Sequence, residues 1–246
     1  MTLALDSNRR AFLRAVGRLS GGLVLLRSTG LGQARAEGAP AKKGAGKAAA
    51  PEADVSPAED LMREHGVLQR LLLVYDEAIR RLDRQEDLPS DTVADAASLI
   101  HSFIEDYHEK LEDEFLFPRF RKAHTLVDLV EVLLAQHQAG RSLTDTTMHL
   151  ANAQALQHVE DRRTLANTLR AFIRMYSPHE AREDTFLFPA FRTIVTPHEY
   201  AGLGETFERR EHQLFGADGL EKIVARVATI ERRLGIYDLA QFTPRP

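Results

Sequence analysis

The chain has no cysteine among its 246 residues. Disulfides, thiolate zinc sites, iron–sulfur clusters and a cysteine nucleophile are therefore all excluded. Any metal that this protein binds must be held by nitrogen and oxygen ligands.

An excess of basic residues is also missing. The chain carries 36 acidic and 32 basic residues, with a net charge of -4 and an isoelectric point near 6.2. We therefore expect no nucleic-acid partner. The sequence also contains no phosphate-binding loop, no nucleophile paired with a base and no dinucleotide fingerprint, so nothing in it indicates a larger organic substrate.

Long apolar runs are absent as well. The apolar run that contains GGLVLL near the N-terminus is too short to span a bilayer, and the charged residue Arg18 interrupts it. It follows the basic segment SNRRAFLRAVG and precedes ARA at positions 34–36. This order resembles a twin-arginine export signal over residues 1–36, with Arg9 and Arg10 as the pair.

The signal implies a location and leaves one alternative. Cleavage after Ala36 gives a periplasmic or otherwise exported protein with no membrane contact. A basic amphipathic helix that remains uncleaved and retains the protein at the membrane is the alternative. Residues 37–55 are rich in Ala, Gly, Lys and Pro without an apolar period, so we expect a flexible linker there.

The folded part is predicted to begin at the SPAE segment. Ser56 is a typical N-cap residue, Pro57 suits the first helical position, and Glu59 follows the cap by three residues. Beyond it, apolar residues recur at helical spacing, and alternation typical of strands is nowhere sustained. Leu61, Leu68, Leu72 and Ile79 form the first such stripe.

Four long helices are expected in residues 56–195. They cover residues 57–85, the segment from the DLPSD break to Pro118, residues 126 to the 150s, and residues from 160 onward, where Pro178 should kink or restart the helix. The third helix presents Val130, Leu133, Leu134 and Met148. Two shorter helices, 197–213 and 217–234, form an extension within residues 196–246. Short connections favour antiparallel neighbours, so the predicted class is all-α, an antiparallel up-down four-helix bundle with two short C-terminal helices.

One segment of this predicted bundle occurs twice. HEKLEDEFLFPRF at 108–120 and HEAREDTFLFPAF at 179–191 agree at nine of thirteen positions. In each copy a histidine and a glutamate four residues later are separated by only about 40° around a helix, so they share one face. These pairs are His108 with Glu112 and His179 with Glu183. Glu109 and Glu180 point about 100° away.

The other two helices each offer one histidine on the apolar stripe. His65 lies on the stripe of the first helix, and His137 continues the stripe of Leu133 and Leu134. The LFP element of each repeat is expected to seal the bundle end and stop the helix. Four histidines and two glutamates can hold two divalent ions, with each carboxylate bridging the pair and two imidazoles on each ion. Such ligands favour iron, with manganese as the alternative. A polar core without metal is the remaining interpretation, although it would bury charged groups at a cost of several kcal/mol each.

At these residues the chain resembles the hemerythrin-like family of histidine–histidine–glutamate cation-binding domains, over residues of about 57–195. It is most similar to the variant with four histidines and two bridging glutamates, known from proteins proposed to repair iron centres after nitrosative damage. The oxygen carriers of the family have a further histidine where this chain has Arg141. The resemblance implies two iron ions, oxo- or hydroxo-bridged, with the ligands His65, His108, Glu112, His137, His179 and Glu183.

Other residues near the predicted site have simpler interpretations. His101 is expected as a hydrogen-bonded core residue near the site, with a role in controlling access to the site or in orienting a ligand as the alternative. Tyr107 and Tyr176 are expected to pack, with a hydrogen bond at the site as the alternative for Tyr176. Arg141 is expected in solvent, with a carboxylate partner as its alternative, and His212 is expected to contact the bundle or cap its helix. Surface positions are predicted for His124, His149, His158 and His198.

The sequence thus predicts an exported, non-haem di-iron protein that binds or reacts with a small ligand such as O2, NO or peroxide. Iron storage or donation and iron-centre repair are alternatives. A third is a structural bundle to which the metal only adds stability. The sequence does not indicate whether the protein has a protein partner.

Overall fold

The computed structural model describes residues 55–244, and every regular element in this part is a helix. The predicted signal, 1–36, and residues 37–54 of the predicted linker lie outside the described residues. The elements are α2 (Pro57–Arg84), α3 (Ser90–Leu99), η1 (Ile100–His108), α4 (Glu109–Leu111), η2 (Glu112–Leu116), α5 (Phe117–Ala123), α6 (Val127–Leu150), η3 (Ala155–Gln157), α7 (Val159–Arg182), η4 (Glu183–Leu187), α8 (Phe188–Ile194), α9 (Pro197–Phe215), α10 (Gly219–Leu234) and η5 (Leu239–Phe242). This confirms the all-α class for the described part.

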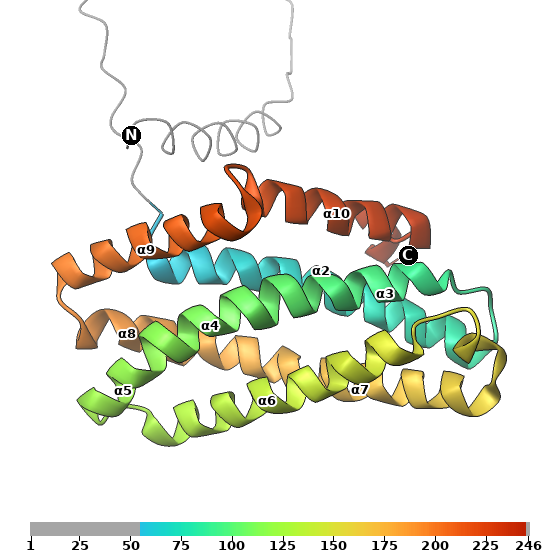
Figure 1. The fold of residues 1–246 in the computed structure, drawn as a ribbon, viewed down its shortest axis with the longest axis horizontal. Coiled ribbons are helices and arrows are strands. Elements are labelled where there is room, and N and C mark those ends of the chain that lie inside the picture. The colour runs from blue at the N-terminus through green and yellow to red at the C-terminus, as the bar shows by residue number, and fades with distance from the viewer. Residues whose placement is uncertain (1–54, 245–246) are drawn as a thin grey trace, which may run out of the picture. The chain divides into compact units, whose positions relative to one another are not determined.

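The elements join into four long helical stretches (Figure 1). They are α2, the continuous run from α3 to α5, α6, and the run from α7 to α8. α2 packs against α7 and against α3 and η1, and α6 packs against the same neighbours. α9 and α10 lie along α2, and α10 also contacts α3 (Figure 1). None of the described helices has the length and apolar character needed to cross a membrane.

Two helices begin as the sequence predicts. Ser56 accepts a hydrogen bond from the Glu59 amide at 3.3 Å, and Pro57 occupies the first turn of α2. Thr196 caps α9 in the same way, with Pro197 in the first turn. A capping hydroxyl satisfies one of the amides that a helix start leaves without a partner.

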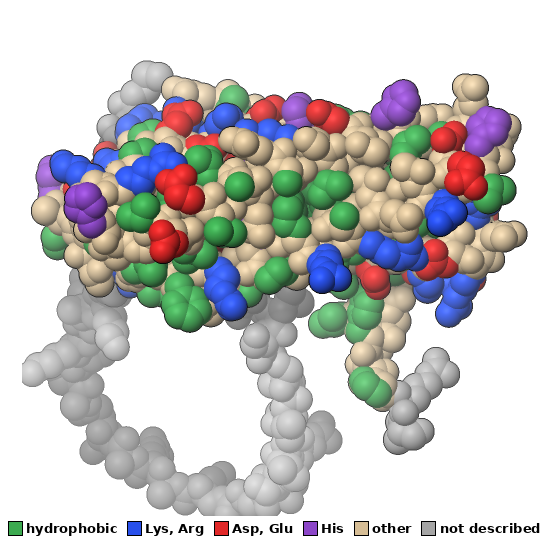
Figure 2. All heavy atoms as spheres, turned by 90° about the horizontal axis from the view of Figure 1, so that it is seen from below, with side chains coloured by type: hydrophobic (Ala, Val, Ile, Leu, Met, Phe, Trp, Pro, Cys, Tyr) green, Lys and Arg blue, Asp and Glu red, His purple; other side chains and the backbone are tan. Residues whose placement is uncertain are grey.

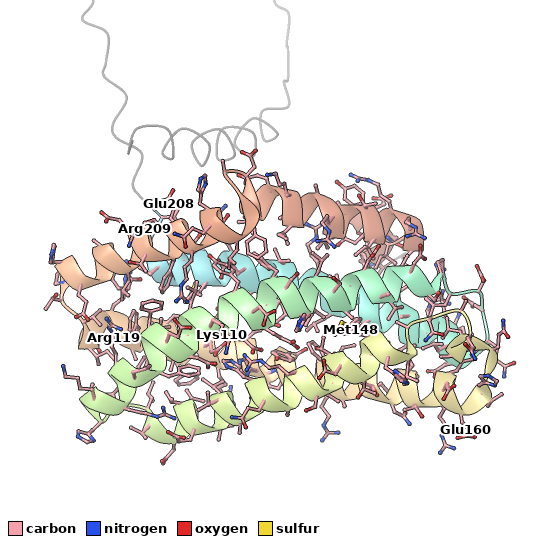
Figure 3. All side chains as sticks on the ribbon, in the orientation of Figure 1. Lys110, Arg119, Met148, Glu160, Glu208 and Arg209 are labelled. Carbon is pink, nitrogen blue, oxygen red and sulfur yellow. The ribbon has the colours of Figure 1, made fainter. Side chains whose placement is uncertain are left out.

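The predicted apolar stripe of α2 is buried throughout, but that of α6 is only partly correct. Val130 and Leu133 are buried, whereas Met148 is exposed and lies at the distal end of α6 (Figure 3). Beyond His137, the inward face of α6 carries small or polar residues instead. They are Gly140, Thr144 and Thr147.

Contrary to the prediction, the prolines of the LFP elements do not end the helices. The chain stays helical through Pro118 to Ala123 and through Pro189 to Ile194. A π-helical turn precedes each proline, so the proline falls in the first turn of α5 or α8, where its missing amide has no helical partner to lose. Of the two outcomes expected at Pro178, a kink or a restart, the restart is wrong, because α7 continues through Pro178 to Arg182.

The surface shows no concentration of one charge on the face drawn in Figure 2. Blue Lys and Arg side chains and red Asp and Glu side chains are interspersed there, with single apolar side chains between them. For this face of the described residues, the distribution agrees with the small net charge of the sequence.

Gly140 makes room for a tyrosine from α7. A Cβ atom placed on Gly140 would lie 2.1 Å from the Tyr176 hydroxyl oxygen. Tyr176 is buried and stacks on Phe172, with ring centroids 4.4 Å apart. The absence of a side chain at Gly140 therefore lets the tyrosine lie directly against the α6 backbone.

We predict that Gly140→Ala lowers the free energy of unfolding by about 1–3 kcal/mol, because the added methyl group forces Tyr176 out of its place. Gly66→Ala is the matched control, since nothing lies within 4 Å of its added Cβ and alanine favours a helix by up to about 1 kcal/mol. Urea unfolding of both variants without metal measures the difference. Equal stability of the two variants would contradict the packing described here.

Candidate metal centre

The structure brings all six predicted residues together. They form two groups of four, in which every side chain is buried and the candidate ligand atoms lie within 4.8 Å of one another. Both groups contain Glu112 and Glu183. One group adds His65 and His108, and the other adds His137 and His179. Two glutamates are thus shared between two pairs of histidines.

Each histidine directs its Nε2 atom at one of the two glutamates. All four Nε2 atoms lie 3.2–3.7 Å from a carboxylate oxygen. The distances are 3.3 Å for His65 to Glu183, 3.7 Å for His108 to Glu112, 3.5 Å for His137 to Glu112 and 3.2 Å for His179 to Glu183. The predicted shared face of each His–Glu pair in the repeat is thereby confirmed.

Each histidine also donates its Nδ1 proton to a side-chain oxygen on another helix. This bond fixes the orientation of the ring and leaves the Nε2 lone pair facing inward. The four bonds are His65 to Asp184 at 2.8 Å, His108 to Glu64 at 2.8 Å, His137 to Asp113 at 2.9 Å and His179 to Gln136 at 2.9 Å.

These four bonds form a closed ring around the site. α2 supplies the partner for the histidine that ends η1, and η2 supplies the partner for the histidine of α6. α6 in turn supplies the partner for the histidine of α7, and η4 supplies the partner for the histidine of α2. Each of the four helical stretches therefore both presents a histidine and orients the next one.

None of these four partners was predicted from the sequence, although the sequence carries a signal for each. Asp113 and Asp184 directly follow the glutamate in both copies of the repeat, as a matched ED pair. Glu64 and Gln136 directly precede the two histidines outside the repeat. Their role depends on which helices are neighbours.

Two phenylalanines from the repeat cover the rings of the other two histidines. Phe117 stacks on His137 with centroids 5.5 Å apart, and Phe188 stacks on His65 at 5.4 Å. Both phenylalanines are buried. The Phe side chains of the LFP elements therefore cover part of the centre, but the predicted helix stop is wrong because the helix continues beyond them.

The buried atoms at the centre fit a metal. Both oxygens of Glu112, both oxygens of Glu183 and the Nε2 atom of His137 are buried without a hydrogen-bond partner in the described structure. Buried carboxylates normally have partners, because an unpaired one costs free energy. A cation among these atoms would supply the missing interactions, and nitrogen and oxygen donors suit iron or manganese.

The pKa values of the metal-free groups also show the effect of burying charged side chains without enough partners. Burial, followed by the negative charge of Glu183, raises the pKa of Glu112 well above its ordinary value. For His65, burial lowers the pKa, but the hydrogen bond to Asp184 and the nearby carboxylate of Glu183 outweigh it and raise the pKa to about 10. The raised pKa values of Glu112 and His65 both reduce the negative charge of the metal-free centre.

Comparisons with known proteins agree with this geometry. The sequence model described as the hemerythrin HHE cation binding domain matches residues 56–158. Two relatives, an uncharacterized protein of Mycobacterium tuberculosis and one of Mycobacterium bovis, are each 49% identical over 193 residues, or 78% of this chain and 76% of the relative. The chain belongs to the hemerythrin HHE cation-binding domain family. No solved structure gives a significant match.

The matched range ends before the second copy of the repeat. It includes four of the predicted residues, namely His65, His108, Glu112 and His137. His179 and Glu183 of this hemerythrin-family chain lie beyond it, and the fold brings them to the same place.

For two residues beside the centre, the alternative interpretation applies. Arg141 has a carboxylate partner: it donates a hydrogen bond to Glu109 at 2.7 Å and another to the Glu105 carbonyl at 3.2 Å. Tyr176 packs in the interior as expected, and its hydroxyl also donates a hydrogen bond to the second oxygen of Glu109 at 2.6 Å. Glu109 does point away from the centre, as predicted, but into a buried network and not into solvent.

The remaining histidines divide into confirmed and corrected predictions. The prediction that His101 is a core residue is wrong, because its side chain is 47% exposed. It does form a hydrogen bond, to Glu105. His212 is exposed and contributes only its carbonyl, which accepts from the Gly216 amide. Tyr107 packs against Phe103 and Phe215, as expected. The predicted surface positions are confirmed for His124, His149, His158 and His198.

Because the central carboxylates lack partners, we predict that removing one of them stabilises the metal-free protein. Glu112→Met keeps the side-chain length and should raise the free energy of unfolding by about 1–3 kcal/mol without metal. Glu114→Met is the control two residues away; it removes only an exposed ion pair with Arg210 and should change stability by less than about 1 kcal/mol.

Denaturant unfolding after chelation measures the stability of the metal-free protein. Unfolding repeated with Fe²⁺ added under anaerobic conditions measures the stability gained from the metal. Wild type and Glu114→Met should gain stability from the metal, and Glu112→Met should gain little. If metal-free Glu112→Met were less stable than metal-free wild type, Glu112 would be a structural residue.

Proposed function

We propose that this chain is an exported, hemerythrin-like, non-haem di-iron protein that binds or reacts with a small ligand such as O2, NO or peroxide. One observation carries the proposal. Two groups of four buried ligand atoms share the carboxylates of Glu112 and Glu183. Shared carboxylates between two pairs of imidazoles provide for two ions and not one.

The donor set supports iron in this proposal. Each ion would have two imidazoles and one oxygen from each shared glutamate, without a thiolate. Four protein donors leave room in a six-coordinate ion, which favours iron or manganese over the four-coordinate zinc of structural sites. Bound iron would supply an open coordination position for the small ligand.

The enclosure of the centre supports a small ligand. All six side chains are at most 4% exposed, and Phe117 and Phe188 cover two of the imidazoles. Only a molecule of a few atoms passes between such closely packed side chains without unfolding the site. We include in the proposal that the four long stretches form an antiparallel up-down bundle around the centre, with α9 and α10 as an added layer.

The proposed location rests on the N-terminal sequence alone. Arg9 and Arg10, the short apolar run and the ARA segment support export through a twin-arginine route, with cleavage after Ala36. Retention at the membrane through an uncleaved signal is the alternative.

Iron storage or donation is the second candidate function. It is supported by a third group of carboxylates, Asp60, Glu64 and Glu211, whose oxygens lie within 4.8 Å of one another. Glu64 also bonds to His108, so this group adjoins the centre. Rapid release of bound iron to a chelator, without a response to NO, would favour storage.

The proposal predicts two iron ions per chain after anaerobic loading, together with visible absorption that changes when NO is added. Glu183→Ala should abolish the two-iron stoichiometry, because both ions lose a shared ligand. Glu205→Ala is the control, since its side chain is 78% exposed and lies on α9. Metal analysis and absorption spectroscopy of the purified protein measure both effects. Fewer than one iron per chain, or zinc alone, would contradict the proposal.

A further inference from the structure

The two halves of the centre are related by sequence position, which allows an internal comparison. Position 65 in α2 corresponds to position 137 in α6, because each supplies the histidine outside the repeat. Their neighbours correspond with the same offset of 72 residues: Glu64 with Gln136, and Gln69 with Arg141. In the repeat, the offset of 71 residues relates Asp113 to Asp184. A difference between corresponding residues therefore gives the two pairs of histidines different chemical surroundings.

The first difference lies in the partners of the repeat histidines. His108 donates to a carboxylate oxygen of Glu64, whereas His179 donates to an amide oxygen of Gln136. The lengths are nearly equal, 2.8 Å and 2.9 Å, so the two bonds differ in the chemical type of the acceptor, carboxyl or amide, and not in length. A carboxylate partner makes an imidazole a stronger metal ligand than a neutral amide does.

The second difference lies one turn further along α2 and α6. Gln69 donates to Glu180 at 2.8 Å, and it is neutral. Its counterpart Arg141 donates to Glu109 at 2.7 Å and also lies 3.9 Å from Asp113, the partner of His137. Of these two corresponding residues only Arg141 is charged, and its positive charge opposes the binding of a cation in the half that contains His137.

The other surroundings do not offset these differences. Asp184 and Asp113 are both aspartates, so the remaining partner is the same in the two halves. Glu64 is also one of the three clustered carboxylates described above. Arg63 lies 3.6 Å from Asp60 of that cluster and compensates part of its charge.

We propose that the two metal positions are unequal: the position between His65 and His108 binds a divalent cation more tightly and fills first, and the position between His137 and His179 binds it more weakly. Glu64, Gln136 and Arg141 set the difference as positioning and charge-setting residues that do not touch the metal. This inference rests on the proposed two-metal function and adds an order of filling to it.

The test is an anaerobic titration of the metal-free full chain with Mn²⁺, followed by calorimetry and by the electron paramagnetic resonance of free Mn²⁺. Wild type should bind two ions in two resolved steps. His137→Ala should keep the tight step, and His65→Ala should keep only the weak one. This pair of variants assigns each step to a position.

Charge exchange at the corresponding positions then tests the cause. Glu64→Gln should weaken the tight step by about 10- to 100-fold, and Gln136→Glu should strengthen the weak step by a similar factor. Arg141→Gln, which copies Gln69, should also strengthen the weak step. Gln138→Glu makes the same chemical change as Gln136→Glu at an exposed position of α6, and it should leave both steps unchanged.

The outcomes separate the inference from the function on which it rests. Fewer than two Mn²⁺ ions bound by wild type would overturn the proposed function and the inequality together. Two ions bound with equal affinity, or a tight step that His65→Ala retains, would overturn the inequality alone. Because Gln136→Glu and Arg141→Gln are expected to improve binding, poor folding of a variant cannot imitate a positive result.

Discussion

The carboxylates of Glu112 and Glu183 lie side by side in the interior without a hydrogen bond to any of their four oxygens. Two buried like charges in this position oppose folding, and the side chains around them compensate part of that cost. Four imidazole Nε2 atoms face them, and phenylalanines keep the surroundings dry. Burial raises the pKa of Glu112 well above its ordinary value in the metal-free protein, and a divalent cation would neutralise both carboxylates instead. A bundle that needed only stability would place apolar side chains here. The cost of the arrangement is therefore the clearest sign that this region serves binding.

The ring of Nδ1 hydrogen bonds connects this chemistry to the fold. Every bond crosses between helical stretches, so the orientation of each imidazole depends on the register of two neighbours. The π-helical turns that begin at Glu112 and Glu183 contribute to this ring. In each turn, the aspartate directly after the glutamate accepts a hydrogen bond from the histidine of an adjacent helix. Wide turns of this kind are common at functional sites in proteins. A shift of one helix would misorient two histidines at once.

Much of the centre could be predicted from sequence because its geometry is local. A histidine and a glutamate four residues apart share a helix face wherever that helix lies, and His65 and His137 follow their apolar stripes. The missed features depend on contacts between helices. Asp113, Gln136 and the pairing of Arg141 with Glu109 require knowing which helix lies beside which. Likewise, the small inward face of α6 reflects Tyr176, which comes from α7 and needs the space at Gly140. Pro118 and Pro189 were misjudged because a π-helical turn shifts each of them into the first turn of the next helix.

The most direct test of the central claim is anomalous diffraction from crystals of the iron-loaded protein. The account predicts two anomalous peaks, about 3.5–4 Å apart as in other two-metal sites. One peak should lie against the Nε2 atoms of His65 and His108, and the other against those of His137 and His179. Both should contact Glu112 and Glu183. A single peak, or iron bound only at the carboxylates of Asp60, Glu64 and Glu211, would contradict the account.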